Sequence, residues 1–355
     1  IGASMDNDSR GPIRVGIVGL GRAGLGMHIP ELSHYPDRFK VVAVCDPVKE
    51  RRDQAVRQLG CRAYRSYPDM LADAFVELVD IATRSCDHFE HALEALKSRR
   101  WVLVETPMAL DYEEAIKLRA AAIKASNRLF VRHNYRFAPG FCKVREIVAD
   151  GRLGEIYDIR LRRGVFQRRD DWQAVKRCGG GQLLNKGTHL IDQALQFLGT
   201  PPAQMFAELK RVAAVGDAED FVRIILRNSA GLTVDLEISG GRIINTPECT
   251  VTGTRGALSL AGETLHVRYL DPARKPPRRR ASVRTPKLGS FGTPETLPWI
   301  DEEIRVEASE TVSLMALWHH LHAAIRRNKP FPVTLDQAVE VMRVADLARK
   351  ETPFA

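Results

Sequence analysis

Three glycines in the pattern Gly-x-Gly-x-x-Gly, at Gly19, Gly21 and Gly24, could bind the pyrophosphate of a dinucleotide. They follow an apolar stretch, residues 13–18, and precede a predicted helix over residues 23–32. The first glycine allows a tight turn, the second lets the backbone approach the phosphates, and the third lets helix and strand pack closely. A glycine-rich turn without a ligand has the same pattern, so the residues that follow have to decide.

Asp46 ends a second apolar stretch, residues 39–45, about twenty residues after the glycines, where an NAD site places the carboxylate that binds the ribose hydroxyls. A carboxylate there would repel a 2′-phosphate, so it favours NAD over NADP. Asp46 could also cap the helix predicted over residues 48–59. Arg51 and Arg52 are near in sequence, but we expect them to be solvated positions on that helix.

His189 is the candidate for proton transfer. On a predicted helix over residues 179–198, Asn185, His189 and Asp192 lie within roughly 60° of one another at about 100° per residue. A histidine among polar groups can give or take a proton near neutral pH, as the interconversion of an alcohol and a carbonyl requires. A structural histidine is the alternative. Asp192 could bind substrate, but orienting His189 or capping a neighbour fits it better.

A charged loop with one tryptophan, residues 167–172, follows a predicted long strand over residues 155–166. The ring of Trp172 could pack on the C–H surface of a sugar, and Arg168 and Arg169 could bind hydroxyls or a carboxylate. This loop predicts a polyhydroxylated substrate, a sugar or cyclitol derivative. A solvated loop is the alternative.

The elements that must position these residues fall into two patterns. Up to residue 133, strands and helices alternate, which predicts a parallel sheet with helices on both faces and ligands at the carboxyl ends of the strands. Beyond it, β-rich runs joined by turns predict an α+β domain with a large, mostly antiparallel open sheet. We therefore expect a Rossmann domain over residues 5–133 and a substrate-binding and oligomerisation domain over residues 134–355. Its closing helix, residues 335–349, could pack back on the first domain.

Composition excludes several other classes. The 355 residues are 44% hydrophobic with no run long enough to span a bilayer, so we expect no membrane partner. The chain shows no secretory signal, and its six cysteines lack metal-site spacing, which predicts a cytoplasmic protein without a metal site. Seven of the nine excess positive charges lie within residues 274–287 of a Pro-rich segment, residues 271–298. A solvated loop explains them better than a nucleic-acid partner.

The predicted open sheet also bears on assembly. One uncovered face of such a sheet would expose substantial apolar area, and association through that face is the usual way to bury it. We therefore expect a homodimer or homotetramer formed through the C-terminal sheet.

Several separated segments together resemble the Gfo/Idh/MocA oxidoreductases, a family that includes glucose–fructose oxidoreductase and inositol dehydrogenase. The resemblance covers essentially the whole chain. It is carried by the glycine motif with His28 and by residues 80–83, 105–107, 133–137, 151–156, 179–192 and 332–334. It implies the fold described above and hydride transfer with a nicotinamide cofactor. It further implies that the cofactor site includes Arg22, Ala23, Thr83, His88 and Glu105, and that the substrate site includes Arg136.

Two departures from the family pattern concern catalysis. The family usually has Glu-Lys-Pro at residues 105–107, with a catalytic lysine, where this chain has Thr106. Many relatives carry an aspartate where this chain has Asn185, and an amide cannot take a proton. We still place Thr106 and Asn185 with His189 in the catalytic set, but His189 remains its only obvious acid–base group. Lys186 lies about 100° around the helix from Asn185, which argues against its replacing the missing lysine.

Three functions remain open on these residues. The first is an NAD-dependent dehydrogenase in which His189 alone transfers the proton. The second is an NAD-dependent glycosidase or lyase that oxidises its substrate transiently. The third is a non-catalytic nucleotide-binding protein. Net NADH after turnover separates the first two, and NAD binding without turnover indicates the third.

Overall fold

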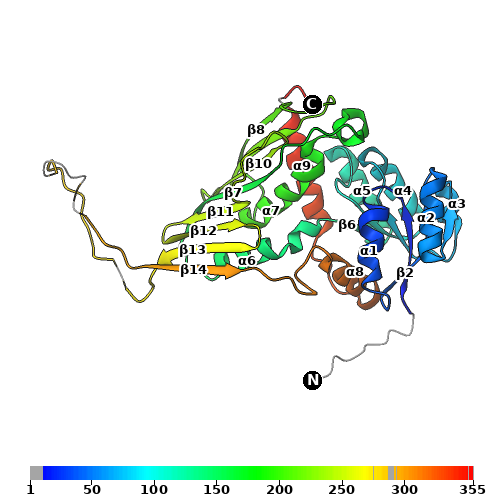
Figure 1. Ribbon diagram of the computed structural model, residues 1–355, viewed down its shortest axis with the longest axis horizontal. Coiled ribbons are helices and arrows are strands. Elements are labelled where there is room, and N and C mark those ends of the chain that lie inside the picture. Colours follow the sequence, from blue (N-terminus) through cyan, green and yellow to red (C-terminus); the bar gives the residue numbers. More distant parts are fainter. Residues whose placement is uncertain (1–10, 275, 287–291, 293, 351, 355) are drawn as a thin grey trace, which may run out of the picture.

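The computed structural model describes residues 11–274, 276–286, 292, 294–350 and 352–354, and it contains two β-sheets (Figure 1). The N-terminal sheet has six parallel strands in the order β3-β2-β1-β4-β5-β6. The C-terminal sheet has eight strands in the order β14-β13-β12-β11-β7-β10-β9-β8. The predicted combination of a Rossmann domain with an α+β domain is confirmed.

The N-terminal sheet places the cofactor motifs at the carboxyl ends of its strands. Its strands are short and, apart from the edge strand β3, largely buried, as helices on both faces require. The order reverses between β1 and β4, and ligands of such sheets bind beside this reversal at the carboxyl ends. The strands are β1 (Ile13–Val18), β2 (Phe39–Cys45), β3 (Arg62–Tyr64), β4 (Leu78–Ile81), β5 (Trp101–Val104) and β6 (Leu129–Val131).

The helix predicted over residues 23–32 consists of two parts, a π-helical turn and a short α-helix. Such π-helical turns occur frequently at functional sites. The helices of this domain are η1 (Gly24–His28), α1 (Ile29–Ser33), α2 (Lys49–Leu59), α3 (Tyr67–Ala72), η2 (Ser85–Asp87), α4 (His88–Lys97) and α5 (Tyr112–Lys124).

The C-terminal sheet is antiparallel except between β7 and β10. Its strands are β7 (Ile156–Gly164), β8 (Gln204–Lys210), β9 (Phe221–Arg227), β10 (Thr233–Ser239), β11 (Cys249–Gly253), β12 (Gly256–Ala261), β13 (Thr264–Leu270) and β14 (Trp299–Arg305). Short turns near the domain junction are η3 (Asn134–Phe137), η4 (Trp172–Ala174), η5 (Lys176–Cys178) and the π-helical η6 (Leu183–Gly187).

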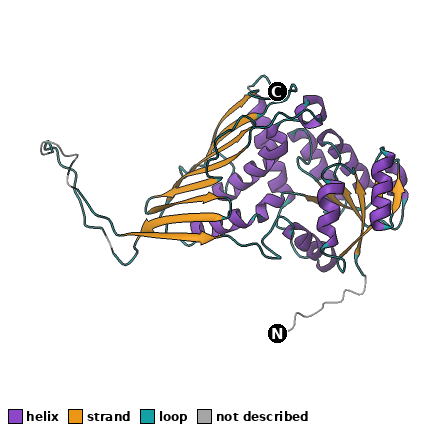
Figure 2. Cartoon of the chain, viewed as in Figure 1, coloured by secondary structure: helices purple, strands orange, loops and turns teal. Residues whose placement is uncertain are grey.

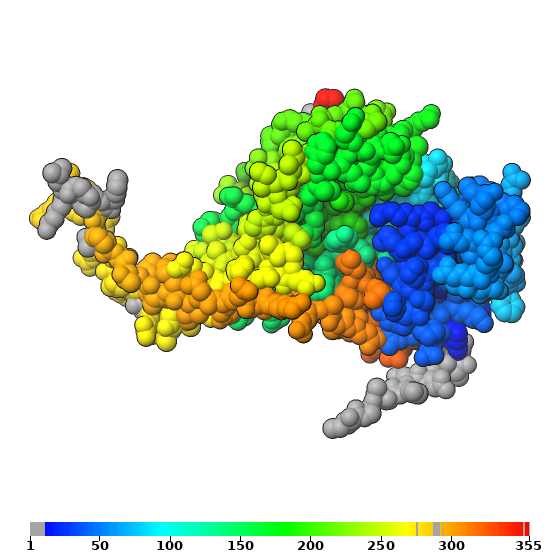
Figure 3. Space-filling model, viewed as in Figure 1, coloured from blue at the N-terminus to red at the C-terminus, as the bar shows by residue number. Residues whose placement is uncertain are grey.

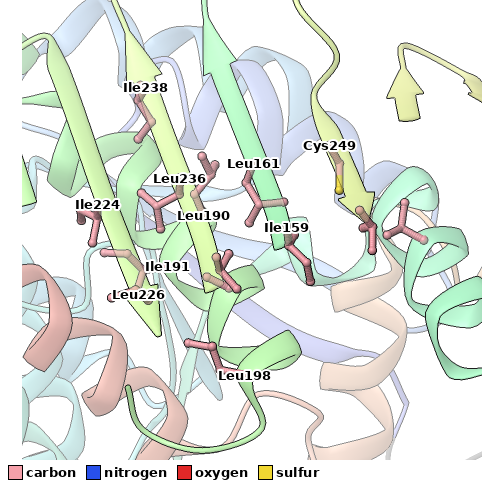
Figure 4. Packing of buried hydrophobic residues seen from close by; sticks show 14 of the residues in the cluster. Ile159, Leu161, Leu190, Ile191, Leu198, Ile224, Leu226, Leu236, Ile238 and Cys249 are labelled. Atoms are coloured by element: carbon pink, nitrogen blue, oxygen red, sulfur yellow. The ribbon is translucent and has the colours of Figure 1, made fainter. Parts of the chain in front are cut away.

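Helices cover only one face of this sheet. They are α6 (Pro139–Ala149), α7 (Thr188–Leu198) and α9 (Leu335–Lys350). Alternate strand residues, such as Leu161 and Leu236, point toward Leu190 and Ile191 of α7 and form one buried core with them (Figure 4). This core fixes α7, and with it His189, against the sheet.

Among the residues that the structure describes, no helix lies on the other face (Figure 2). This face combines charged pairs with exposed apolar side chains such as Phe206 of β8 and Trp299 of β14. Asp235 of β10 lies between Arg162 of β7 and Arg223 of β9, at 2.7 and 2.9 Å. Arg268 of β13 pairs with Asp301 of β14 at 3.4 Å. Assembly through this sheet stays a prediction.

The segment of residues 271–298 joins β13 to β14, and its described residues, 271–274, 276–286, 292 and 294–298, extend beyond the sheet (Figure 3). Its described residues form neither helix nor strand over most of its length, in agreement with the predicted loop. Lys275 and Lys287 lie outside the described residues. Across the described ranges of the chain, no helix combines the length and apolar character needed to cross a membrane.

Two late helices pack against the N-terminal domain. In α8 (Ala316–Arg327), Trp318 is fully buried in the same core as Ile17 and Phe39. In α9, Met342 belongs to the N-terminal core, while Val344 belongs to the core of the C-terminal sheet. The chain thus returns to its first domain after completing the second.

Candidate active site

The turn after β1 has the geometry of a phosphate-binding turn. Gly19 has a φ of +91°, and a Cβ there would lie 2.6 Å from the carbonyl oxygen of Ala82. A Cβ on Gly24 would overlap the carbonyl oxygen of Gly19, so this position also needs glycine. A Cβ on Gly21, by contrast, would meet nothing within 4 Å. Space is therefore left open at the position where a pyrophosphate would approach the backbone.

Asp46 is buried beside this turn with both carboxylate oxygens in use. It accepts hydrogen bonds from the backbone N–H groups of Leu20 and Val48, each at 2.8 Å. Arg51 lies 3.5 Å from the carboxylate, and Arg52 donates to the carbonyl oxygen of Asp46 at 2.6 Å. Arg52 is thus anchored at the end of β2 instead of solvated as expected. The carboxylate is held at the cofactor edge by the glycine turn itself.

Behind the turn lies a buried network of charges that was not predicted from the sequence. His28 contacts Asp80 through Nδ1 at 2.7 Å and Glu105 through Nε2 at 2.8 Å. Arg132 donates to the same Glu105 oxygen at 2.8 Å and to Glu31 at 2.7 Å. Both partners of His28 are acceptors, so its ring must be protonated on both nitrogens to donate to each. This network joins the first helix to the residue that precedes Thr106.

The charges of the network shift its titration. Burial lowers the pKa of His28, but the charge of Asp80 and the hydrogen bonds to Asp80 and Glu105 outweigh burial and raise the pKa to about 9. Burial alone would raise the pKa of Glu105, whereas Arg132 and His28 hold it far below its usual range. An imidazolium and a carboxylate are therefore both present at neutral pH.

We expect this imidazolium to make folding stability depend on pH. The pKa of His28 in the folded protein lies above the ordinary value of about 6.5. The contribution of its imidazolium to the free energy of unfolding is therefore complete below about pH 6.5 and is lost as the pH rises through about 9. His28→Gln should therefore lower the melting temperature by at least about 2–4 °C at pH 6 and by clearly less at pH 10. Thermal unfolding measures this, with His266→Gln on exposed β13 as control. A difference that persists unchanged at pH 10 contradicts the assignment.

His88 and Thr83 connect the loops that follow β4 and β5. His88 is buried, and its Nδ1 lies 2.7 Å from the carbonyl oxygen of Pro107, while its Nε2 lies 3.2 Å from that of Thr83. Burial lowers the pKa of His88, so the neutral ring has one proton, which the shorter contact to Pro107 uses best. The Thr83 hydroxyl in turn contacts His91 at 3.2 Å. His88 thus braces the loop that carries Thr106.

Thr106 and His189 meet across the domain junction. The Thr106 hydroxyl oxygen lies 3.2 Å from His189 Nε2, although the two residues are 83 positions apart. Thr106 follows β5 of the N-terminal domain, and His189 lies in the first turn of α7. The structure therefore brings together two residues of the predicted catalytic set, and it does so beside the network of Glu105.

The environment of His189 keeps its ring neutral. Burial and the neighbouring His133 lower the pKa of His189 to about 3. Its ring is 4.7 Å from that of Tyr135, centroid to centroid, and 6.0 Å from that of His133. Its Nδ1 is shielded from solvent and has no hydrogen-bond partner. A neutral imidazole is the form that can accept a proton.

The loop after β7 lies close to the glycine turn. Arg169 pairs with Asp171. Burial raises the pKa of Asp171, but the contacts to Arg169 and Gln173 and the charge of Arg22 outweigh burial and lower it. Asn185 donates to the side chain of Gln173 at 3.2 Å. Arg168 is exposed, whereas Trp172 is partly buried at the start of η4. The predicted substrate loop thus borders both Asn185 and the cofactor edge.

Arg136 and Asp192 bind each other. The guanidinium contacts both carboxylate oxygens of Asp192, one of them at 3.0 Å, and both side chains are buried. Arg136 also donates to the carbonyl oxygen of Pro332 at 2.8 Å and to Gln337 at 2.7 Å. These contacts fix α7 to the interdomain segment and to the start of α9.

The glycine turn and the carboxylate after β2 are features of an NAD-binding domain. The histidine–threonine pair lies where this domain meets the α+β domain. Together they indicate a two-domain oxidoreductase of the NAD-binding type. Residues 13–133 match the oxidoreductase family with an NAD-binding Rossmann fold, and residues 141–259 match the GFO/IDH/MocA C-terminal domain. The chain belongs to the Gfo/Idh/MocA family of oxidoreductases.

Similar proteins act on different substrates. The chain is 24% identical to scyllo-inositol 2-dehydrogenase (NADP(+)) IolW of Bacillus subtilis, over 96% of this chain and 94% of that protein. It is 25% identical to 2,7-anhydro-N-acetylneuraminate hydratase of Escherichia coli, over 83% and 84%. The crystal structure of GenD2 from gentamicin A biosynthesis, in complex with NAD, aligns with a TM-score of 0.76 and 25% identity over 95% of this chain and 93% of that one.

Proposed function

We propose that this protein oxidises a CH–OH group of a sugar, cyclitol or related polyhydroxylated substrate with NAD, and that His189 takes the hydroxyl proton. The observation that carries the proposal is the contact between Thr106 and His189 at the junction, next to the open glycine turn. Dehydrogenase activity on an inositol in a relative that spans nearly the whole chain supports the substrate class.

The residues at the cofactor edge fit a dinucleotide. Gly19, Gly21, Arg22 and Ala23 would hold the pyrophosphate, and Asp46 would bind the ribose hydroxyls. When bound, the nicotinamide supplies a hydride acceptor or donor. We infer a preference for NAD, because the Asp46 carboxylate would repel a 2′-phosphate. Arg51 offsets part of this charge from 3.5 Å, and the inositol dehydrogenase relative uses NADP.

The proton step rests on the position of His189, whose Nε2 lies 3.2 Å from the Thr106 hydroxyl oxygen at the domain junction. Burial keeps its ring neutral. As a substrate carbon becomes a carbonyl, its hydroxyl proton must leave, and a neutral imidazole within hydrogen-bond reach can accept it. The Thr106 hydroxyl holds the ring and can pass a proton to or from it. Thr106 therefore occupies the position of the family lysine, and it orients His189 instead of supplying a positive charge.

Other predicted residues divide into contacts and supports. We infer that Asn185, Trp172, Arg168 and Arg169 contact the substrate; Asn185 donates to Gln173 of the loop after β7, and Arg169 pairs with Asp171 of that loop. Arg136 and Asp192, which were predicted to bind substrate, use their polar atoms on each other and on the chain. We infer that this pair positions α7.

A second candidate is a lyase that oxidises its substrate only transiently. Two observations favour keeping it: Thr106 stands where the family usually has a catalytic lysine, and a relative of similar extent is a hydratase. In such a reaction the cofactor returns to its starting state at the end of each turnover, so no reduced cofactor accumulates.

One assay separates these candidates. We expect NADH to accumulate when the protein is incubated with NAD and a panel of polyols and sugar acids, and to accumulate faster with NAD than with NADP. Product formation without NADH would replace the first proposal by the lyase. Bound NAD with neither product nor exchange of substrate hydrogen with solvent would indicate a non-catalytic nucleotide-binding protein. A higher rate with NADP would contradict the interpretation of Asp46.

A further inference from the structure

Lys186 is a partly buried cation surrounded by other cations. It lies in η6, three residues before His189, and its side chain makes no hydrogen bond or ion pair within the described part of the chain. Burial and then the charges of Arg163, Arg169 and Arg22 lower its pKa, and no carboxylate is among the groups that act on it. The arginines come from three different segments, so the fold itself assembles this group.

The carboxylates nearby do not balance these charges. Arg163 pairs with Glu248, and Arg169 pairs with Asp171. Arg22 and Lys186 have no ion-pair partner among the described residues. The pyrophosphate of a bound dinucleotide would neutralise Arg22, which belongs to the glycine turn, but Lys186 would remain unpaired. A partly buried cation that lies among other cations and has no carboxylate partner is unfavourable, and a bound anion would relieve this repulsion.

The position of Lys186 shows which anion it can reach. Lys186 lies in η6, which runs directly into α7, and His189 follows it three residues later in the first turn of α7. Tyr135 packs against His189 at 4.7 Å, and the guanidinium of Arg163 lies 5.8 Å from the centre of the Tyr135 ring. The cations therefore border the proton acceptor itself.

We propose that the substrate carries a carboxylate or phosphate group, and that Lys186 binds this group together with Arg169 beside His189. This inference rests on the proposed function, because it takes the junction as the substrate site. It narrows the substrate class from polyols in general to acidic or phosphorylated ones. An ammonium group binds either anion as a point charge, and a guanidinium adds directed hydrogen bonds.

Binding to the full chain saturated with NAD tests the proposal by isothermal titration calorimetry. D-glucuronate and D-glucose 6-phosphate are the anionic probes, and D-glucose is the neutral one. We expect one anionic probe to bind at least about tenfold more tightly than D-glucose, and this advantage should shrink as salt is added. The probe that shows it distinguishes a carboxylate from a phosphate.

Three variants locate the effect. Lys186→Gln should remove most of the advantage while leaving the affinities for NAD and D-glucose unchanged, and Lys186→Arg should retain it. Lys329→Gln, at an exposed position after α8, is the matched control. Equal binding of charged and neutral probes, or an advantage that survives Lys186→Gln, overturns the inference.

The same measurements keep this inference separate from the proposed function. Oxidation of a neutral polyol without any preference for charged probes would refute only the role of Lys186. A charge preference that depends on Lys186, in a protein that transfers no hydride, would refute only the proposed reaction.

Discussion

His189→Ala is expected to lower kcat by on the order of 10²–10⁴-fold, the usual contribution of a positioned acid–base group. Thr106 and Asn185, the other members of the predicted catalytic set, cannot replace it, because neither side chain takes up a proton near neutrality. NAD affinity should stay nearly unchanged, since the ring contacts Thr106 and Tyr135 and no part of the glycine turn. Steady-state kinetics and NAD titration of the same preparations measure both quantities.

The pH profile adds an independent check. Since the pKa of His189 is held near 3, the ring is neutral across the ordinary range and should become inactive as a base only when the pH falls toward that value. We therefore expect kcat/KM for alcohol oxidation to show no limb from this residue between pH 6 and 8. His266→Ala, on exposed β13, is the control. Near-normal turnover in His189→Ala would move proton transfer to the loop of residues 167–172 or rule it out.

Gly21→Val is expected to weaken NAD binding by about 100-fold or more, because its side chain would occupy the space where the pyrophosphate approaches the backbone. The same space is empty in the folded chain, with no atom within 4 Å of a Cβ at this position. The melting temperature without cofactor should therefore change little. Calorimetric titration with NAD and thermal unfolding of the same variant separate the two effects.

Gly26→Val provides the matched control for Gly21→Val. Gly26 lies in η1, five residues further along, and a Cβ there also meets nothing within 4 Å. It should alter NAD affinity much less, because it lies past the turn itself. If Gly21→Val binds NAD as tightly as Gly26→Val, the glycine turn does not hold the pyrophosphate.

The sequence predicted the elements whose residues are apolar on a regular period. The apolar stretch of residues 39–45 forms the strand β2, Phe39–Cys45. The last three strands, β12 to β14, were missed. In β14, alternate residues such as Asp301 and Glu303 face away from the helices and pair with β13, so the charges mask the strand pattern.

The sequence predicted which residues form the candidate site, but only part of how they contact one another. His189 and Thr106 stand out by motif, but their hydrogen bond depends on how two domains meet. The His28 network joins residues 52 and 77 positions apart, which no local pattern reveals. A polar residue directly after the buried strand β6, Arg132, was the available signal. Lys186 was set aside on ideal α-helical angles, whereas η6 is a π-helical turn to which those angles do not apply.

The return of α8 and α9 to the first domain has a consequence for how the chain acquires its structure during synthesis. Trp318 and Met342 fill cores most of whose members are made some two to three hundred residues earlier. The nucleotide-binding half therefore leaves the ribosome with gaps in its interior and cannot close until translation is nearly finished. Because α9 fills both interiors at once, the two halves should reach their final state together, as one cooperative unit.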